Sequence, residues 1–237
     1  MSVHNLDDFD LGEMAKCTSE IRRLGSNAKS LDEFATALVR YFYQDFVQDN
    51  AGNKACALVR LFQTVRFVDL PAELQTIAVS GLASDGCNPS MRCMVLRATA
   101  GDKREWNAPE HSIHHRVIPL PSVELVQQMP MIAQLVLDLG LRVSDVLEPP
   151  EHVLIHKSEQ DYNIFYVGDA HGCPVIPAQK EFVEPHQVKS VLGFGGMLPS
   201  GNLFAVILFS KVKLSRTVAE RFRSLALAVN LAIMPFE

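Results

Sequence analysis

The chain has 237 residues, of which 48% are hydrophobic, and its formal net charge is −5, which is enough apolar sequence for one large core. The acidic balance and the scattered Lys and Arg residues argue against a nucleic-acid-binding surface. The longest apolar run, Leu225–Phe236, contains Asn230 and is shorter than the roughly 20 residues that cross a bilayer. Residues 1–10 also lack the regions of a signal peptide, so we expect a cytoplasmic protein with no membrane span.

The N-terminal part of the chain predicts two helices. Over residues 5–24, one stripe has the 3–4–3 spacing of a short coiled-coil seam, which would pack either within the chain or against a second copy: Leu11, Met14, Thr18 and Ile21. Gly25-Ser26-Asn27 is expected to end this helix. Ser30 and Glu33 form a capping box that starts the second helix. Its predicted buried face comprises Leu31, Phe34, Ala35, Leu38, Phe42 and Phe46.

The middle of the chain predicts strands separated by loops and short helices. Extended segments are expected at Cys56–Phe67, Met91–Ala98 and Val117–Leu120. A polar loop over residues 101–110 carries the single tryptophan, Trp106. Ser122 can cap a helix that Pro130 kinks or divides and that Gly140 ends.

The C-terminal part predicts three strands and a closing helix. The strands are expected at Tyr162–Val167, Val188–Leu198 and Leu203–Ser210. The last of them is apolar on both faces, which is typical of a central strand that is covered on both sides. The strand before it is nearly bare at Gly193 and Gly195, where a helix or a ligand could approach closely. With the helix Thr217–Met234, this order of elements predicts an α+β fold around an antiparallel sheet.

Two segments carry a resemblance to a known family. They are residues 162–179 (YNIFYVGDAHGCPVIPAQ) and residues 188–216 (VKSVLGFGGMLPSGNLFAVILFSKVKLSR). Both look like the GAF-like region at the N-terminal end of bacterial PAS-containing sensor histidine kinases, and QMPMIAQLVLDLGL, residues 128–141, also fits that group. The resemblance covers about residues 28–236 and is most specific over residues 160–215.

The GAF resemblance implies a particular arrangement of layers. It implies a central antiparallel sheet with the first and last helices on one face and pocket-closing loops and helices on the other. In this chain the first helix would be residues 30–47, the last residues 216–234, and the pocket side about residues 100–185. The chain would then consist of an N-terminal helical extension, residues 1–27, and a GAF-like sensory domain, residues 28–237.

The resemblance also implies a function. It implies a non-catalytic sensory or regulatory domain of a bacterial signal-transduction protein, which binds a small molecule or a partner and signals as a homodimer through its terminal helices. The abrupt apolar end at MPFE favours the excised sensor end of a longer kinase. The pocket residues we expect are Phe165, Tyr166, Asp169 and His171. The sequence identifies no ligand or cofactor, because neither the tetrapyrrole signatures nor the cyclic-nucleotide N-K-x-D-E signature of GAF domains is found. A ligand-free dimerisation module is an alternative.

A thiol enzyme is an alternative of another class. The odd number and irregular spacing of the cysteines are typical of reduced thiols: Cys17, Cys56, Cys87, Cys93 and Cys173. Free-methionine sulfoxide reductases share the GAF fold and use loop cysteines, for which Cys87 and Cys93 would be the candidates here. Zinc prefers tighter cysteine pairs, and buried thiols behave as small hydrophobic groups.

The densest histidine cluster lies at residues 111–115. Its polar and proline-rich surroundings predict a solvated loop, and a metal or haem contact and a hydrogen-bonding role on the pocket side are the other interpretations. A haem would need an axial ligand, for which the candidates are His111, His114, His115, His156 and His171.

Overall fold

A computed structural model describes residues 3–48, 52–80, 82, 88–149 and 163–237. Its centre is a six-stranded antiparallel sheet in the order β5-β4-β3-β8-β7-β6. The strands are β3 (Cys56–Arg66), β4 (Arg92–Gly101), β5 (Val117–Leu120), β6 (Ile164–Val167), β7 (Ser190–Met197) and β8 (Leu203–Ser210). The fold is therefore α+β, as the order of elements predicted.

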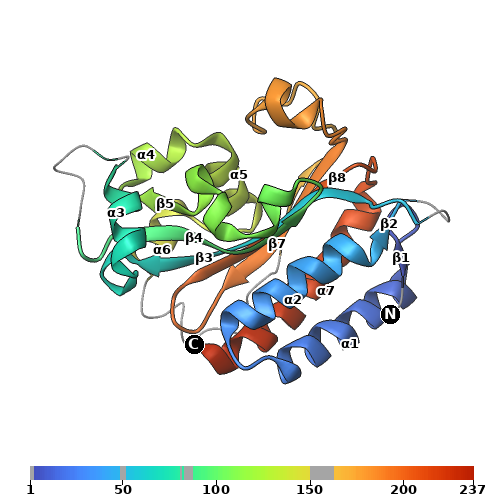
Figure 1. The fold of residues 1–237 in the computed structure, drawn as a ribbon, viewed down its shortest axis with the longest axis horizontal. Helices are drawn as coiled ribbons and strands as arrows, with labels where there is room; N and C mark the ends of the chain where they lie inside the picture. The colour runs from blue at the N-terminus through green and yellow to red at the C-terminus, as the bar shows by residue number, and fades with distance from the viewer. Residues whose placement is uncertain (1–2, 49–51, 81, 83–87, 150–162) are drawn as a thin grey trace.

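Two helices, α2 (Leu31–Gln44) and α7 (Arg216–Ile233), cover one face of this sheet, and α1 (Leu11–Asn27) packs on the outside of them (Figure 1). Between them and the sheet lies an aromatic core whose largest members are fully buried, namely Phe9, Phe34, Phe42, Phe46, Phe194, Phe204 and Phe222. Next to this core, β1 (His4–Asn5) and β2 (Phe46–Val47) form a small parallel pair. α2 and α7, which correspond to the helices expected at residues 30–47 and 216–234, lie on the same side of the sheet.

Short helices and loops cover the opposite face (Figure 1). The helices are α4 (Val123–Gln127), α5 (Pro130–Asp138) and α6 (Val143–Leu147), with α3 (Ala72–Ser80) near the β5 edge of the sheet. Single turns of 3₁₀ or π helix occur at Phe67–Asp69, Arg104–Asn107, Pro109–His111, Ile113–His115, Gln179–Val183 and Met234–Phe236. Pro130 divides the predicted helix in two, and Gly140 follows it in the left-handed conformation, with φ 79°.

The N-terminal helix differs from the prediction at both ends. It begins at Leu11, where the Asp10 side chain accepts a hydrogen bond from the Glu13 amide, and it continues to Asn27 instead of ending at Gly25. The glycine serves close helix packing, since a Cβ there would lie 2.7 Å from the Cβ of Ala232 on α7. Of the seam on this helix, Ile21 is buried within the chain and Met14 packs against the same core, whereas Leu11 is 66% exposed.

Other boundaries follow the sequence closely. Ser30 caps α2 by accepting from the Glu33 amide, as predicted. All eight residues of β8 are buried, which confirms a central strand covered on both faces. Among the helices that the structure describes, none combines the length and the apolar character needed to cross a bilayer.

Candidate functional site

A cavity of about 580 Å³ lies on the sheet face opposite α1, α2 and α7. Its floor is formed by β3 and β8, and its walls come from α5, residues 105–115 and residues 176–182. Most of the lining is apolar, including Leu58, Phe62, Trp106, Met131, Leu135, Ile176, Phe182, Ile207 and Phe209. This volume lies within the range of small-molecule sites, which are typically about 300–1,000 Å³.

A buried arginine lies in the floor of this cavity. Leu58, Arg60 and Phe62 alternate along β3, so their side chains share the cavity face, while Val59 and Leu61 face the aromatic core. Arg60 is only 8% exposed, and its Nε atom has no hydrogen-bond partner. Burial lowers the pKa of Arg60 to about 10, so the guanidinium is still charged at neutral pH.

A second polar group without a partner lies in the wall. Ser112 is 7% exposed, and its Oγ atom makes no hydrogen bond. The segment that carries it is anchored to the end of β4: Thr99 Oγ1 donates to the Trp106 carbonyl at 2.9 Å, and Asn107 Nδ2 donates to the Gly101 carbonyl at 3.0 Å. These contacts hold residues 106 and 107 of this segment against β4, whereas the Ser112 hydroxyl itself makes no hydrogen bond.

The histidine cluster borders the same cavity. His111, His114 and His115 all line it, so the cluster lies on the pocket side. Desolvation, and then the charges of Arg60 and His114, lower the pKa of His115 to about 4. The His115 ring is nevertheless exposed to the open cavity, where water screens part of this effect. In the part of the chain that the structure describes, no three His, Cys, Asp or Glu residues form a cluster able to hold a metal ion, and His156 lies outside the described residues.

Aromatic rings form the end of the cavity near residues 176–186. The Trp106 ring lies 5.4 Å from the Phe182 ring and 4.6 Å from the His186 ring, and Phe182 lies edge-on to Phe209 at 5.0 Å. This segment is held in place by Gln179, whose Nε2 atom lies 2.9–3.2 Å from three main-chain carbonyls and whose Oε1 atom accepts from the Gly172 amide. Because these hydrogen bonds hold the segment in place, this wall of the cavity is formed before any ligand binds.

The four residues expected from the resemblance do not border this cavity. Phe165 is fully buried in the apolar layer next to it, and Tyr166 faces the other side of the sheet, where its hydroxyl donates to the Leu214 carbonyl at 2.5 Å. Asp169 pairs with Lys213 at 3.2 Å, and that contact lowers the pKa of the Asp169 carboxyl. His171 is exposed and lies 3.8 Å from Glu184. The four residues are therefore close in sequence, but their side chains do not meet around this cavity.

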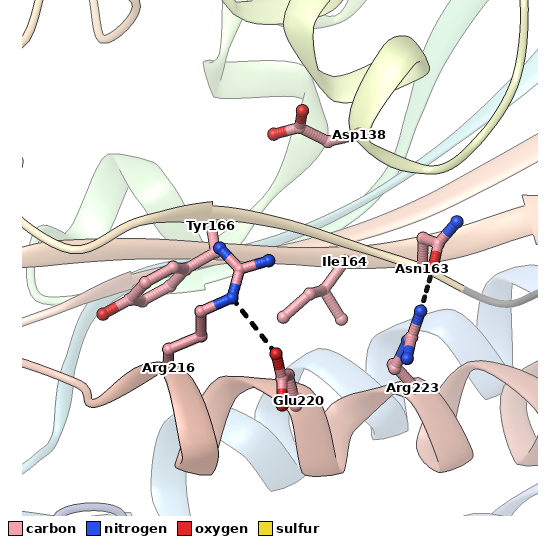
Figure 2. Close-up of a pocket in the computed structure, with 7 residues that line it drawn as sticks. All are labelled: Asp138, Asn163, Ile164, Tyr166, Arg216, Glu220 and Arg223. Atoms are coloured by element: carbon pink, nitrogen blue, oxygen red, sulfur yellow. Dashed lines mark hydrogen bonds and ion pairs between the residues drawn. The ribbon is translucent and has the colours of Figure 1, made fainter.

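Tyr166 borders a second, smaller pocket of about 180 Å³ at the β6 edge (Figure 2). Side chains from α7 point toward β6 there, and Asp138 of α5 lies across from them. The pocket is polar, but its arginines are engaged: Arg216 pairs with Glu220 at 3.1 Å, and Arg223 donates to Asn163. It therefore presents no buried group that lacks a partner.

The cysteines do not form a site within the described residues. Cys93 is fully buried in β4, packed in an apolar cluster with Met91 and Val95, and Cys87 lies outside the described residues. Cys17 and Cys56 are buried as well, and burial raises the pKa of each to about 12, so both thiols are protonated.

Sequence reasoning overlooked Arg60 and Ser112. The available signal was a cation inside a strand segment that is otherwise apolar, in the string LVRLF. No family model matches the chain, and no curated protein matches it either.

The lowered pKa of His115 predicts a pH effect on stability. The unfolded chain binds a proton near the ordinary histidine pKa of about 6.5, whereas desolvation lowers the pKa of His115 in the folded protein. Between the two pKa values the unfolded state holds more protons, so stability falls as the pH falls. We expect His115→Gln to reduce this loss in urea unfolding at pH 7 and pH 5, with His171→Gln, at a position that does not line the cavity, as the control. Identical pH dependence in wild type and His115→Gln would contradict a lowered pKa.

Proposed function

We propose that the chain is a GAF-like sensory domain, without catalysis of its own, that binds a small organic molecule in the cavity over β3 and β8. The observation that carries this proposal is an apolar cavity of about 580 Å³ whose two buried polar groups, Arg60 Nε and Ser112 Oγ, lack partners. Buried polar groups are nearly always hydrogen-bonded, so two such groups in one cavity point to a ligand or ordered water. The layered arrangement expected of a GAF domain supports the proposal further.

The sheet offers a physical route from the cavity to the terminal helices. In β3, Arg60 and Phe62 line the cavity, while Val59 and Leu61 on the other face join the core that α2 and α7 cover. A ligand that moves β3 would therefore change the packing of these helices. To transmit a signal, the ligand must bind the two packing arrangements of the helices with different affinities. The difference in binding free energy is typically about 1–3 kcal/mol. A kinase or another output region would receive the change, as the resemblance implies.

Native mass spectrometry of gently purified protein tests ligand binding. We expect an excess mass of a small organic molecule on the wild type. Ile118→Trp, which places an indole at the cavity wall, should lose that mass, whereas the exposed Leu137→Trp should retain it. Bare wild-type mass, together with no thermal stabilisation by any compound in a metabolite panel, would contradict the proposal and favour a ligand-free dimerisation module.

The proposed homodimer has a candidate surface at the C-terminal end of α7. The exposed side chains there are apolar and spaced at helical intervals, with Leu227 45%, Leu231 47% and Met234 39% exposed. The exposed positions nearer the start of α7 are polar instead, such as Glu220 and Arg223. Val229 lies in the core and not on this surface, so a charge there would disturb folding and would not test dimerisation.

We expect Leu227→Glu to convert a dimer into a folded monomer, because the substitution places a charge in an apolar contact. Size-exclusion chromatography with light scattering measures the mass, and circular dichroism checks the fold. Leu137→Glu, at an exposed position on α5, is the matched control and should stay dimeric. A wild type that is already monomeric at tens of micromolar would contradict the dimer.

A further inference from the structure

The guanidinium of Arg60 is buried without a counter-charge. The residue is more than nine-tenths buried, and among the residues that the structure describes no carboxylate pairs with it. Burying a charge costs free energy unless the charge is paired and hydrogen-bonded. Leu58 and Phe62 flank the side chain on the same face of β3, so its aliphatic stem is accommodated and only the charged end lacks a partner. The cavity that Arg60 lines is where a partner could bind.

The other groups in the cavity decide what kind of partner fits. Ser112 offers an unused hydroxyl, and His115 feels the Arg60 charge and remains neutral near pH 7. His111 and His114 also border the cavity, and Glu105 and Glu181 do so from exposed positions. Among the described residues that line the cavity, Arg60 is thus the one arginine or lysine, and most of the side chains around it are apolar.

We propose that the ligand is an amphipathic organic monoanion, a carboxylate whose head pairs with Arg60 and accepts a hydrogen bond from Ser112, while its apolar body fills the rest of the cavity. This inference rests on the proposed function of the cavity as a ligand site. A guanidinium matches a carboxylate with two parallel hydrogen bonds. A dianionic phosphate monoester would bring a second negative charge that Arg60 alone does not neutralise, and the two glutamates would repel it. A cationic head would oppose Arg60 directly.

Isothermal titration calorimetry at pH 7.5 with decanoate, decan-1-ol, decylamine and decyl phosphate tests the class of ligand. We expect wild type to bind decanoate at least about 30-fold more tightly than decan-1-ol, which is typical of a hydrogen bond to a charged group, and more tightly than the other two probes. Arg60→Met should lower decanoate affinity to that of the alcohol and leave alcohol binding unchanged. Arg66→Met, on the exposed end of the same strand, should bind like wild type.

The outcomes separate the two proposals. Equal affinity for decanoate and decan-1-ol in wild type would overturn the anionic class while leaving the cavity as a ligand site. Tighter binding of decyl phosphate would overturn the monoanion. Binding of none of the four probes would overturn the amphipathic monoanion, and native mass spectrometry would then decide separately whether the cavity is a ligand site. Thermal unfolding checks that Arg60→Met is folded, and we expect no loss of stability because the variant removes an unpaired buried charge. If it does not fold, the four probes on wild type still decide the class.

Discussion

Replacing Phe222 with alanine is expected to lower the free energy of unfolding by about 3–5 kcal/mol. Phe222 is fully buried on α7, and its ring lies 5.0 Å from the Phe9 ring and 5.7 Å from the Phe194 ring. It also lies within 6.4 Å of Phe42 and Phe46. The substitution removes a side chain that joins α7 to α2 and to the sheet, and neighbouring aromatic rings cannot collapse fully into the space left behind.

Urea unfolding followed by circular dichroism measures this loss. Ser224→Ala is the matched control on the same helix, because Ser224 is exposed and lies outside the proposed dimer surface, and we expect it to change stability by less than about 0.5 kcal/mol. A loss of less than about 1 kcal/mol for Phe222→Ala would contradict the packing of α7 against the sheet.

Replacing Gly195 with alanine is expected to destabilise the protein by about 3 kcal/mol or more, at the upper end of overpacking effects. A Cβ at this position would overlap the main-chain carbonyl oxygen of Phe204 and lie 3.0 Å from the Cα of Ala205, both on β8. Main-chain atoms of a central strand cannot move aside as the end of a flexible side chain can. Thermal unfolding, or the yield of folded protein, measures the effect.

Gly193→Ala, two residues earlier on β7, is the matched control. A Cβ there would meet Leu135 Cδ1 at 3.0 Å and Phe165 atoms at 3.2 Å, which are side-chain atoms. We expect a smaller loss, of about 1 kcal/mol. If Gly195→Ala were no more harmful than Gly193→Ala, the close β7–β8 approach would be wrong.

Much of the fold could be predicted because local chemistry and global packing agree. The double apolar character of β8 placed it at the centre of the sheet, and Ser30 with Glu33 placed the start of α2. The end of α1 was missed because the local signal at Gly25 is that of a break, while the actual role of the glycine is contact with Ala232 on α7, more than two hundred residues away. Propensity does not report contacts of that range.

The candidate site was less predictable. The cavity lies on the sheet face that the resemblance assigns to a pocket, but the expected residues at 165–171 lie in β6 and the turn after it and do not line the cavity. The lining comes from β3, β8 and loops whose paths depend on anchors such as Thr99, Asn107 and Gln179. The histidines can be found in the sequence as a cluster, but whether they face the cavity depends on the path of their loop, and those tertiary hydrogen bonds set that path. Arg60 could be predicted as a site residue only if it were known which face of β3 borders the cavity.

Methyl-region NMR of the ¹³C-labelled protein, titrated with decanoate and decan-1-ol, tests most directly the claim that this cavity is a ligand site. We expect saturable shifts of the methyl groups that line the cavity, Leu58, Leu135 and Ile207, with none at the exposed Val68 and Val79, which lie outside both the cavity lining and α7, beyond those caused by dilution. Cavity methyl signals that stay unchanged with both probes, or shifts confined to Val68 and Val79, would contradict it.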